Sequence, residues 1–324
     1  MVKGIHWDQG AETWDEMIHD ESSPHYHYYR TIDMLVVQLL RDVQARRALE
    51  LGCGTAECSL YVLRILEDMK DLHIVGVDSS AKMIEIAQRK AKAAGVTERI
   101  TLKVEEATQL SYPEEHFDAI FSRGAILSYL KRPHKLLRAA HSALKEEGVI
   151  GLDVLPQPPE GRDYHIFRSP EIQLTGSKSQ SDTSFITVHE VFTRGKYQIV
   201  RRYRVQRDTQ LYNELKQSFQ NLPSHLPGLI EPPKLLLQAT VMTEERVRLY
   251  TVPEITHAFQ KAGFDVTKIY GAGYTLRLLK DEEIRSFVNK HRDIFCRIEI
   301  LLNALFNLQY ATMLFITGRK KSAT

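Results

Sequence analysis

The chain has 324 residues, of which 43% are hydrophobic and 26% are charged, so it can bury a complete α/β core together with a sizeable additional unit. Its formal net charge is only +2, which argues against nucleic acid or an anionic membrane as the main partner. The sequence contains no apolar run long enough to span a membrane and no apolar core of a secretory signal near Met1, so we expect a cytoplasmic protein.

An amino-terminal arm, residues 1–44, precedes the first predicted strand and is rich in aromatic and histidine residues. It contains Trp7, Trp14 and the run His25-Tyr26-His27-Tyr28-Tyr29, which leads into a predicted helix over Tyr29–Leu40. Alternating histidines can bind metal, but no third or fourth ligand stands nearby at a metal spacing. We therefore predict no metal site.

The most informative motif is an apolar strand that runs into a glycine turn, Ala48-Leu49-Glu50-Leu51-Gly52-Cys53-Gly54-Thr55. Gly52 and Gly54 allow a sharp turn and a close approach of the backbone to a ligand, and the helix predicted after the turn offers unpaired N–H groups at its start. A dinucleotide site would need a third glycine, but Glu57 stands at that position. The carboxylate of Glu50 suits a ligand with a positive charge, such as S-adenosylmethionine.

After this turn the chain alternates predicted strands and helices, and polar residues follow three of the strands. The predicted strands are Leu72–Asp78, Ile100–Val104, Phe117–Phe121, the segment after Glu147-Gly148, the segment that begins at Ala262-Gly263-Phe264, and Tyr310–Gly318. Asp78-Ser79-Ser80 ends the first of these strands, and Met83 follows in the next predicted helix. Glu105-Glu106-Ala107-Thr108 follows the second strand, and Ser122-Arg123-Gly124-Ala125 follows the third.

This ordered set of motifs resembles the class I S-adenosylmethionine-dependent methyltransferases, in particular the small-molecule group of types 11 and 25, over about residues 45–155 and 251–319. The resemblance implies an α/β fold with a doubly wound, mostly parallel sheet of seven strands. It implies S-adenosylmethionine as the cofactor and S-adenosylhomocysteine as the product. The cofactor-binding residues that it implies are Glu50, Gly52, Cys53, Gly54, Asp78, Ser79, Met83, Glu106, Ala107, Ser122 and Arg123.

The resemblance also implies roles for several of these residues. Asp78 stands where the family has its ribose-binding carboxylate, and Met83 stands where an apolar side chain often packs against adenine. Glu106 and Ala107 resemble the pair that meets the adenine amino group, although the family more often has Asp in place of Glu106. The strand end at Ser122-Arg123 borders the transferred methyl group in the family.

The arm helix resembles the leading helix that lies over the cofactor site in this family. Tyr26 or Tyr29 is therefore a candidate to close over the sulfonium or to hold the acceptor, because aromatic faces and hydroxyl oxygens both favour a cation. The alternative is an amphipathic helix whose tyrosine hydroxyls point into water.

An insertion, residues 156–238, separates the fifth strand from the helix before the sixth, and we predict that it forms an α+β cap. Ser184–Phe192 and Lys196–Val205 flank Gly195 and predict a β-hairpin. The proline-rich segment Leu222–Leu237 predicts either a mobile lid or a contact between two copies in a homodimer.

Glu190 is the most informative polar residue of the predicted hairpin, because alternation places it on an apolar face. Partial burial would raise its pKa and let it act as a base toward the acceptor. The alternative is an ion pair with Arg201, Arg202 or Arg204 across the hairpin.

The carboxy-terminal part, residues 239–324, completes the predicted core and contains a long amphipathic helix from Glu283 to Leu308. We expect its apolar stripe to pack on the sheet or the cap. The stripe consists of Ile284, Phe287, Val288, Ile294, Phe295, Ile298, Leu301, Leu302, Leu305 and Phe306. The three cysteines, Cys53, Cys58 and Cys296, fit no zinc spacing and are expected to be reduced packing residues.

These features predict a methyltransferase whose acceptor is a small, partly apolar molecule enclosed by the arm and the insertion. The candidate catalytic residues are Tyr29, Glu190 and Arg123. Methyl transfer is an in-line displacement that depends mainly on positioning, so it does not require an obvious catalytic dyad. Two alternatives remain open: a protein or RNA methyltransferase with an open groove, and a non-enzymatic, cofactor-binding partner protein of the same fold.

Overall fold

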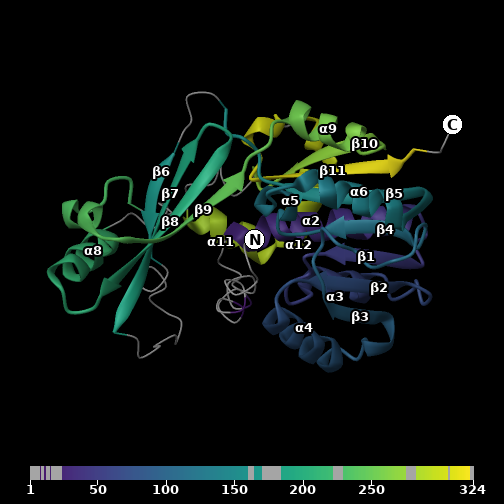
Figure 1. Cartoon of the computed structure of the whole chain (residues 1–324), viewed down its shortest axis with the longest axis horizontal. Helices are drawn as coiled ribbons and strands as arrows, with labels where there is room; N and C mark the ends of the chain where they lie inside the picture. Colours follow the sequence, from purple (N-terminus) through teal and green to yellow (C-terminus); the bar gives the residue numbers. More distant parts are fainter. Residues whose placement is uncertain are drawn as a thin grey trace. The chain divides into compact units, whose positions relative to one another are not determined.

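The computed structural model describes residues 8, 11, 15, 24–159, 164–169, 184–221, 229–274, 282–305 and 307–321. The chain forms two compact units (Figure 1), of which the first comprises Met1–Pro156 and Tyr250–Thr324 and the second comprises Gln157–Leu249. The second unit extends beyond the predicted boundary at Gln238, because strand β9 (Val241–Arg248) pairs with a strand of the insertion.

Within the described ranges, the first unit contains a seven-stranded sheet in the order β10-β11-β5-β4-β1-β2-β3. Strands β5, β4, β1, β2 and β3 run parallel, whereas β11 is antiparallel to both of its neighbours. This arrangement confirms the predicted doubly wound, mostly parallel sheet. The strands are β1 (Arg47–Leu51), β2 (His73–Asp78), β3 (Ile100–Val104), β4 (Phe117–Ser122), β5 (Leu144–Val154), β10 (Phe264–Ala272) and β11 (Met313–Lys320).

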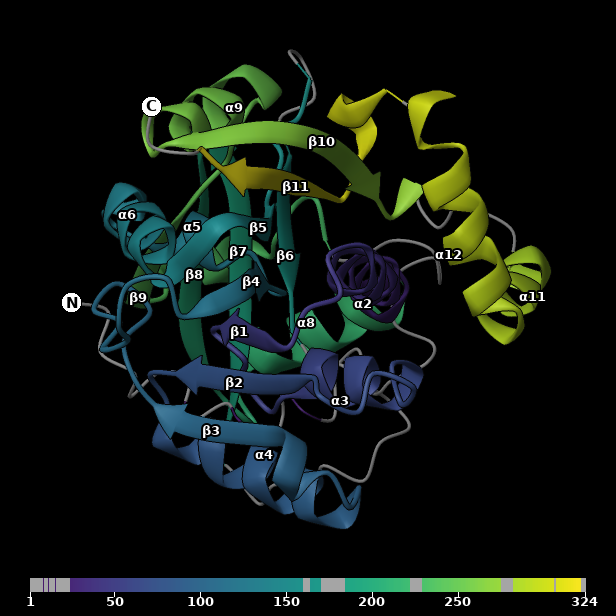
Figure 2. The same cartoon turned by 90° about the vertical axis from the view of Figure 1, so that its right-hand side faces the viewer.

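Helices cover both faces of this sheet, which explains why its central strands are apolar on both sides. Helices α2 and α3 lie on one face and α6 and α9 on the other (Figure 2). None of the helices described is both long and apolar enough to cross a lipid bilayer. The helices of this unit are α2 (Pro24–Asp42), α3 (Glu57–Ile65), α4 (Ala81–Ala93), α5 (Ile126–Tyr129), α6 (Pro133–Ala143), α9 (Val252–Lys261), α11 (Glu282–Lys290) and α12 (Arg292–Leu301), with the short 3-10 helices η1 (Thr97–Arg99), η3 (Asn303–Leu305) and η4 (Leu308–Tyr310).

The described part of the second unit forms a four-stranded antiparallel sheet in the order β6-β7-β8-β9. The predicted hairpin is confirmed, with Gly195 at a φ of 58° in the turn between β7 and β8. Apolar side chains of α8 and η2 pack on one face of this sheet. The elements are β6 (His165–Arg168), β7 (Phe185–Arg194), β8 (Tyr197–Gln206), β9, α8 (Gln210–Gln220) and η2 (Lys234–Gln238). Of the proline-rich segment, residues 222–228 lie outside the described residues.

The predicted long helix near the carboxyl end is two helices, α11 and α12, which are separated at His291. The prediction that its apolar stripe packs on the sheet or the cap is wrong for most of its residues. The stripe residues that are exposed are Ile284, Phe287, Ile294, Ile298, Leu301, Leu302 and Leu305, whereas Val288 is buried and Phe306 lies outside the described residues.

Helix α12 instead turns polar residues inward, because these residues satisfy polar groups of neighbouring elements. The buried Glu299 contacts His27 Nε2 of α2 at 3.2 Å and accepts a hydrogen bond from the Gly273 N–H at 3.1 Å. In η3, which follows α12, the Asn303 side chain donates to the Gly271 carbonyl at 2.8 Å. Unpaired buried groups are costly, so these bonds decide which face of α12 points inward.

We expect Glu299→Ala to lower the free energy of unfolding by about 2–3 kcal/mol, because it leaves the Gly273 N–H buried without this acceptor and removes the carboxylate that contacts the His27 ring. Urea denaturation monitored by circular dichroism measures this loss. Arg297→Ala, on the exposed side of the same helix, is the matched control and should change stability by less than about 0.5 kcal/mol. Equal effects of the two substitutions would contradict the structural role of Glu299.

Candidate functional site

Three of the predicted segments meet at the carboxyl edge of the parallel strands. Leu51, the last residue of β1, pairs with Val77 of β2 and with Ser122 of β4. The loops that follow β1, β2 and β4 therefore begin side by side at one edge of the sheet, where ligands of open α/β sheets bind.

The first loop is the glycine turn between β1 and α3. Gly52 and Gly54 have φ angles of 65° and 52°, which explains the choice of glycine at both positions. Ala56, just before α3, also adopts a left-handed conformation, with a φ of 62°. A left-handed alanine is strained by roughly 1 kcal/mol, and such strain is found preferentially at functional sites.

The carboxylate of Asp78 joins the first two loops. Its Oδ2 accepts a hydrogen bond from the Gly54 N–H at 2.9 Å, and its Oδ1 accepts one from the Ser80 N–H at 2.9 Å. Burial raises the pKa of Asp78 above its ordinary value, although these two N–H groups oppose that rise. Each carboxylate oxygen has a further lone pair, so Asp78 can accept additional hydrogen bonds from a ligand.

The described residues of the arm contact helix α4, which follows Asp78. Asp8 accepts hydrogen bonds from the Ser80 hydroxyl at 2.5 Å and from the Lys82 N–H at 3.1 Å. Ala11 packs with Met83 and Ile86. The structure thus places Met83 against the arm, and its predicted contact with adenine stays a prediction.

The loop after β3 presents one of its two adjacent acids to solvent. Glu105 accepts hydrogen bonds from the backbone and side chain of Ser111, at 2.7 and 3.0 Å. Glu106 is exposed, and Ala107 beside it is buried. Of the two acids, Glu106 is therefore the more exposed, and its predicted contact with the adenine amino group stays a prediction.

A buried ionic cluster lies near the same strand ends and contains three of the predicted residues, Glu50, Arg123 and Tyr29. The Arg123 guanidinium lies 3.4 Å from Asp33 Oδ1 of α2 and 4.7 Å from the centre of the Tyr29 ring. Burial alone would lower the pKa of Arg123, but the nearby Asp33 carboxylate raises it above its ordinary value. Burial raises the pKa of the Tyr29 phenol to about 12, so Tyr29 stays protonated at neutral pH.

Glu50 is also part of this cluster, and its side chain is fully enclosed. It accepts a hydrogen bond from the Ser59 hydroxyl of α3. Burial raises its pKa to about 7, against the opposing effects of Ser59 and Arg123. Burial thus favours the neutral form of Glu50, and the expectation that it offers a carboxylate to a cationic ligand stays a prediction.

This raised pKa predicts a dependence of stability on pH. Because the pKa of Glu50 is 4.5 when unfolded and about 7 when folded, its proton stabilises the fold below pH 4.5, and this contribution disappears as the pH rises through about 7. We expect the wild type to lose about 3 kcal/mol of unfolding free energy over this range relative to Glu50→Gln. Chemical denaturation at a series of pH values measures the difference. The control is Glu67→Gln, a substitution at an exposed glutamate, which should leave the pH dependence of stability unchanged. If the stability of the wild type and of Glu50→Gln changed with pH in parallel, the effect of burial on Glu50 would be disproved.

Asp153 and Asp33 belong to the site and were missed by the sequence analysis. Asp153, on β5, accepts hydrogen bonds from the Ser122 hydroxyl at 2.9 Å, the Gly124 N–H at 2.7 Å and the Ala125 N–H at 2.9 Å. It thereby holds the loop after β4, including the predicted residues Ser122 and Arg123. An acid inside the apolar run Val149–Val154 was the available indication of such a role.

Glu190 lies in the second unit and is enclosed by hydrogen-bond donors. It accepts from Tyr203 Oη at 2.5 Å, from His165 Nε2 at 2.7 Å and from Arg201 at 3.4 Å. These contacts support the ion-pair alternative over a role as a free base, since its carboxylate oxygens already have partners.

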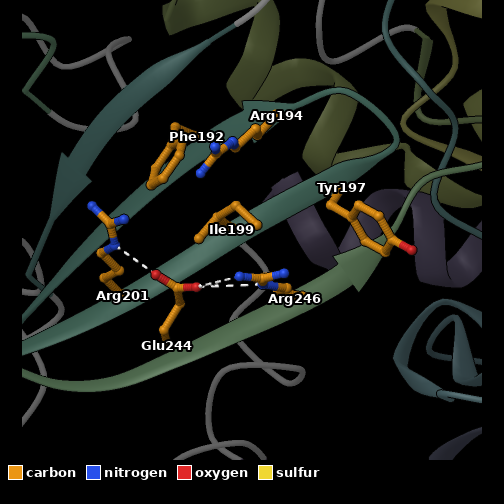
Figure 3. Close-up of a pocket in the computed structure, with 7 residues that line it drawn as sticks. All are labelled: Phe192, Arg194, Tyr197, Ile199, Arg201, Glu244 and Arg246. Atoms are coloured by element: carbon orange, nitrogen blue, oxygen red, sulfur yellow. Dashed lines mark hydrogen bonds and ion pairs between the residues drawn. The ribbon is translucent and has the colours of Figure 1, made fainter.

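A pocket of about 290 Å³ opens on the sheet of the second unit, and Phe192 and Ile199 are among the residues that line it (Figure 3). Glu244 lies between Arg201 and Arg246 and pairs with both, at 2.9 and 3.2 Å. Aromatic and aliphatic side chains thus share this lining with charged ones.

Comparison with known proteins finds similarity to methyltransferases over part of the first unit. A family model described as a methyltransferase domain matches residues 48–148. Phosphoethanolamine N-methyltransferase 1 of Arabidopsis thaliana is 31% identical over 105 residues, which cover 32% of this chain and 20% of that protein. A demethylmenaquinone methyltransferase of Thermotoga maritima is 28% identical over 151 residues, which cover 45% of this chain and 62% of that protein. The chain thus matches about a fifth of the plant relative and less than two thirds of the bacterial one.

The fold comparison extends over nearly the whole chain. A solved structure of an S-adenosylmethionine-dependent methyltransferase from Clostridium acetobutylicum superposes with a TM-score of 0.57 and 12% identity, and the match covers 98% of this chain and 100% of that one. At such low identity the likeness concerns the fold alone.

Proposed function

We propose that the protein transfers a methyl group to a small, partly apolar acceptor. This proposal starts from the similarity of the chain to class I S-adenosylmethionine-dependent methyltransferases. The observation that carries this proposal is the Asp78 carboxylate, which the Gly54 and Ser80 N–H groups hold beside the glycine turn.

The residues around the glycine turn fit S-adenosylmethionine. The free lone pairs of Asp78 suit two adjacent ribose hydroxyls. The buried Thr55 hydroxyl has no hydrogen-bond partner among the residues that the structure describes, so a ligand in the turn can supply one. When bound, S-adenosylmethionine supplies a methyl group that its positively charged sulfur has already activated.

We propose that the chain contributes mainly by positioning. Asp153 holds the loop after β4, and the Asp33–Arg123 pair with Tyr29 over the guanidinium fixes the arm helix against that loop. Arg123 and Tyr29 then act as positioning residues and not as bases, because both are buried and stay protonated at neutral pH. Holding donor and acceptor in line can account for much of the rate acceleration of such a displacement.

We propose that the pocket of the second unit binds a small ligand. Its apolar side chains, Phe192 and Ile199, suit the apolar part of such a ligand, and Arg194 beside them suits a polar or anionic part. The relatives include proteins named for phosphoethanolamine and for demethylmenaquinone.

The proposal is tested by incubating the purified protein with methyl-labelled S-adenosylmethionine and a fractionated extract of its source organism. We expect the label in the small-molecule fraction, and mass spectrometry of the product then identifies the acceptor. Label in protein or RNA would replace this proposal by the macromolecular alternative. Tight cofactor binding without transfer to any fraction would favour a non-enzymatic, cofactor-binding role.

A further inference from the structure

A row of large apolar side chains faces solvent along α11, α12 and η3. We call it the apolar row, and it consists of Ile284, Phe287, Ile294, Ile298, Leu301 and Leu305. Their exposed fractions range from 41% for Ile298 to 80% for Leu301. Single exposed apolar residues are common, but six along one continuous segment mark an interaction surface.

The spacing of the apolar row places its residues on one side of each helix. Ile284 and Phe287 are three residues apart in α11, and Ile294, Ile298 and Leu301 are four and three residues apart in α12. The ring of His291 lies 4.6 Å from that of Phe287, so the row continues across the break between α11 and α12.

The area of the apolar row suits a stable protein contact. Its six side chains together expose on the order of 700 Å². This exceeds the roughly 300–600 Å² of the largest apolar patch on a typical monomer, and it is close to the ~800 Å² that each partner contributes to a standard interface.

The charges beside the apolar row favour a second copy of the chain over a membrane surface. Exposed residues of both signs flank the row, with Glu283 and Asp293 against Lys290 and Arg297. A helix that lies on a membrane would carry an excess of lysine and arginine. Charges of both signs beside the row suit a contact with another protein surface.

We propose that the apolar row is a homodimer interface, in which it packs antiparallel against the same row of a second copy. In a dimer with a twofold axis, the same surface of each subunit contacts its counterpart. The row is then buried in both subunits, and no further copy can add to the assembly. Glu299 on the inner face of α12 and Asn303 at the start of η3 are bonded to the core, and they fix the row outward.

The proposal is tested by sedimentation equilibrium of the full chain over a range of concentrations. We expect a dimer for the wild type and a dimer dissociation constant at least ~30-fold higher for Leu301→Glu and for Ile294→Glu, because each buries a charge in the interface. Both positions are exposed in the single chain, so circular dichroism should show an unchanged fold. Ile65→Glu, at another exposed isoleucine, is the matched control and should leave the dimer intact.

Three outcomes would overturn the proposal. The first is a wild type that stays monomeric at every concentration. The second is a dimer that both row variants leave unchanged. The third is a monomeric wild type that binds phosphatidylcholine vesicles, together with a Leu301→Glu variant that does not bind them. This result would assign the surface to a membrane.

Discussion

Asp78→Ala should raise the dissociation constant for S-adenosylmethionine by ~100-fold or more. Hydrogen bonds to a charged group contribute about 1.5–3 kcal/mol each, and Asp78 is proposed to make two to the ribose. A loss of about 3 kcal/mol corresponds to this change in affinity. Isothermal titration calorimetry with S-adenosylhomocysteine measures it without any knowledge of the acceptor.

The control for this experiment is Asp118→Ala. Asp118 resembles Asp78 in its local bonding, because it accepts hydrogen bonds from the Arg46 and Arg47 N–H groups, at 2.9 and 2.8 Å. It lies at the start of β4, at the opposite edge of the sheet. Its loss should therefore lower stability and leave cofactor affinity unchanged. Unaltered affinity in a folded Asp78→Ala protein would refute the site assignment.

Arg123→Met should have the largest effect on stability, a loss of about 3–5 kcal/mol in the free energy of unfolding. The substitution removes the guanidinium that lies 3.4 Å from the buried Asp33 carboxylate and leaves it only the longer contact with Arg30, at 3.8 Å. It also removes a charge that lowers the pKa of Glu50, so that pKa should rise further. Guanidinium chloride denaturation at neutral pH measures the loss of stability. The methyl-transfer rate should also fall, because the loop after β4 loses its contact with α2.

A second variant separates the ion pair from general damage to the core. Asp33→Asn combined with Arg123→Met removes both charges, so the double variant should be more stable than the sum of the two single losses predicts. We expect a coupling free energy of about 2 kcal/mol or more from this cycle. Strict additivity would mean that Arg123 acts through packing alone, and the proposed role of the pair in positioning the loop would then fail.

The fold was largely predictable because its indications are local. Ile100–Val104 was predicted with the bounds that the structure shows, and the glycine turn was placed correctly after β1. Asp78 could be chosen as a ligand-binding acid since it directly ends an apolar strand. Each of these predictions rests on backbone geometry or on the alternation of polar and apolar residues within a few positions.

The prediction that failed depended on what a helix packs against. The apolar stripe from Ile284 to Phe306 was expected to pack on the sheet or the cap, because helical periodicity identifies an apolar face but not its direction. The structure turns most of that face outward, since the opposite face carries Glu299, which contacts His27 and accepts a hydrogen bond from the Gly273 N–H. Helical spacing alone contains no information on these distant partners.

The sequence by itself therefore determined the alternating α/β core, the glycine turn and the acid at the end of β2, because steric limits on φ and the burial of apolar strands act over short stretches of chain. Only the tertiary structure decided the environment of Arg123, the protonation of Glu50 and the orientation of α12. These depend on Asp33, Asp153 and Glu299, which come from separate parts of the sequence. A buried charge is tolerated only where a partner meets it, and folding alone brings such partners together.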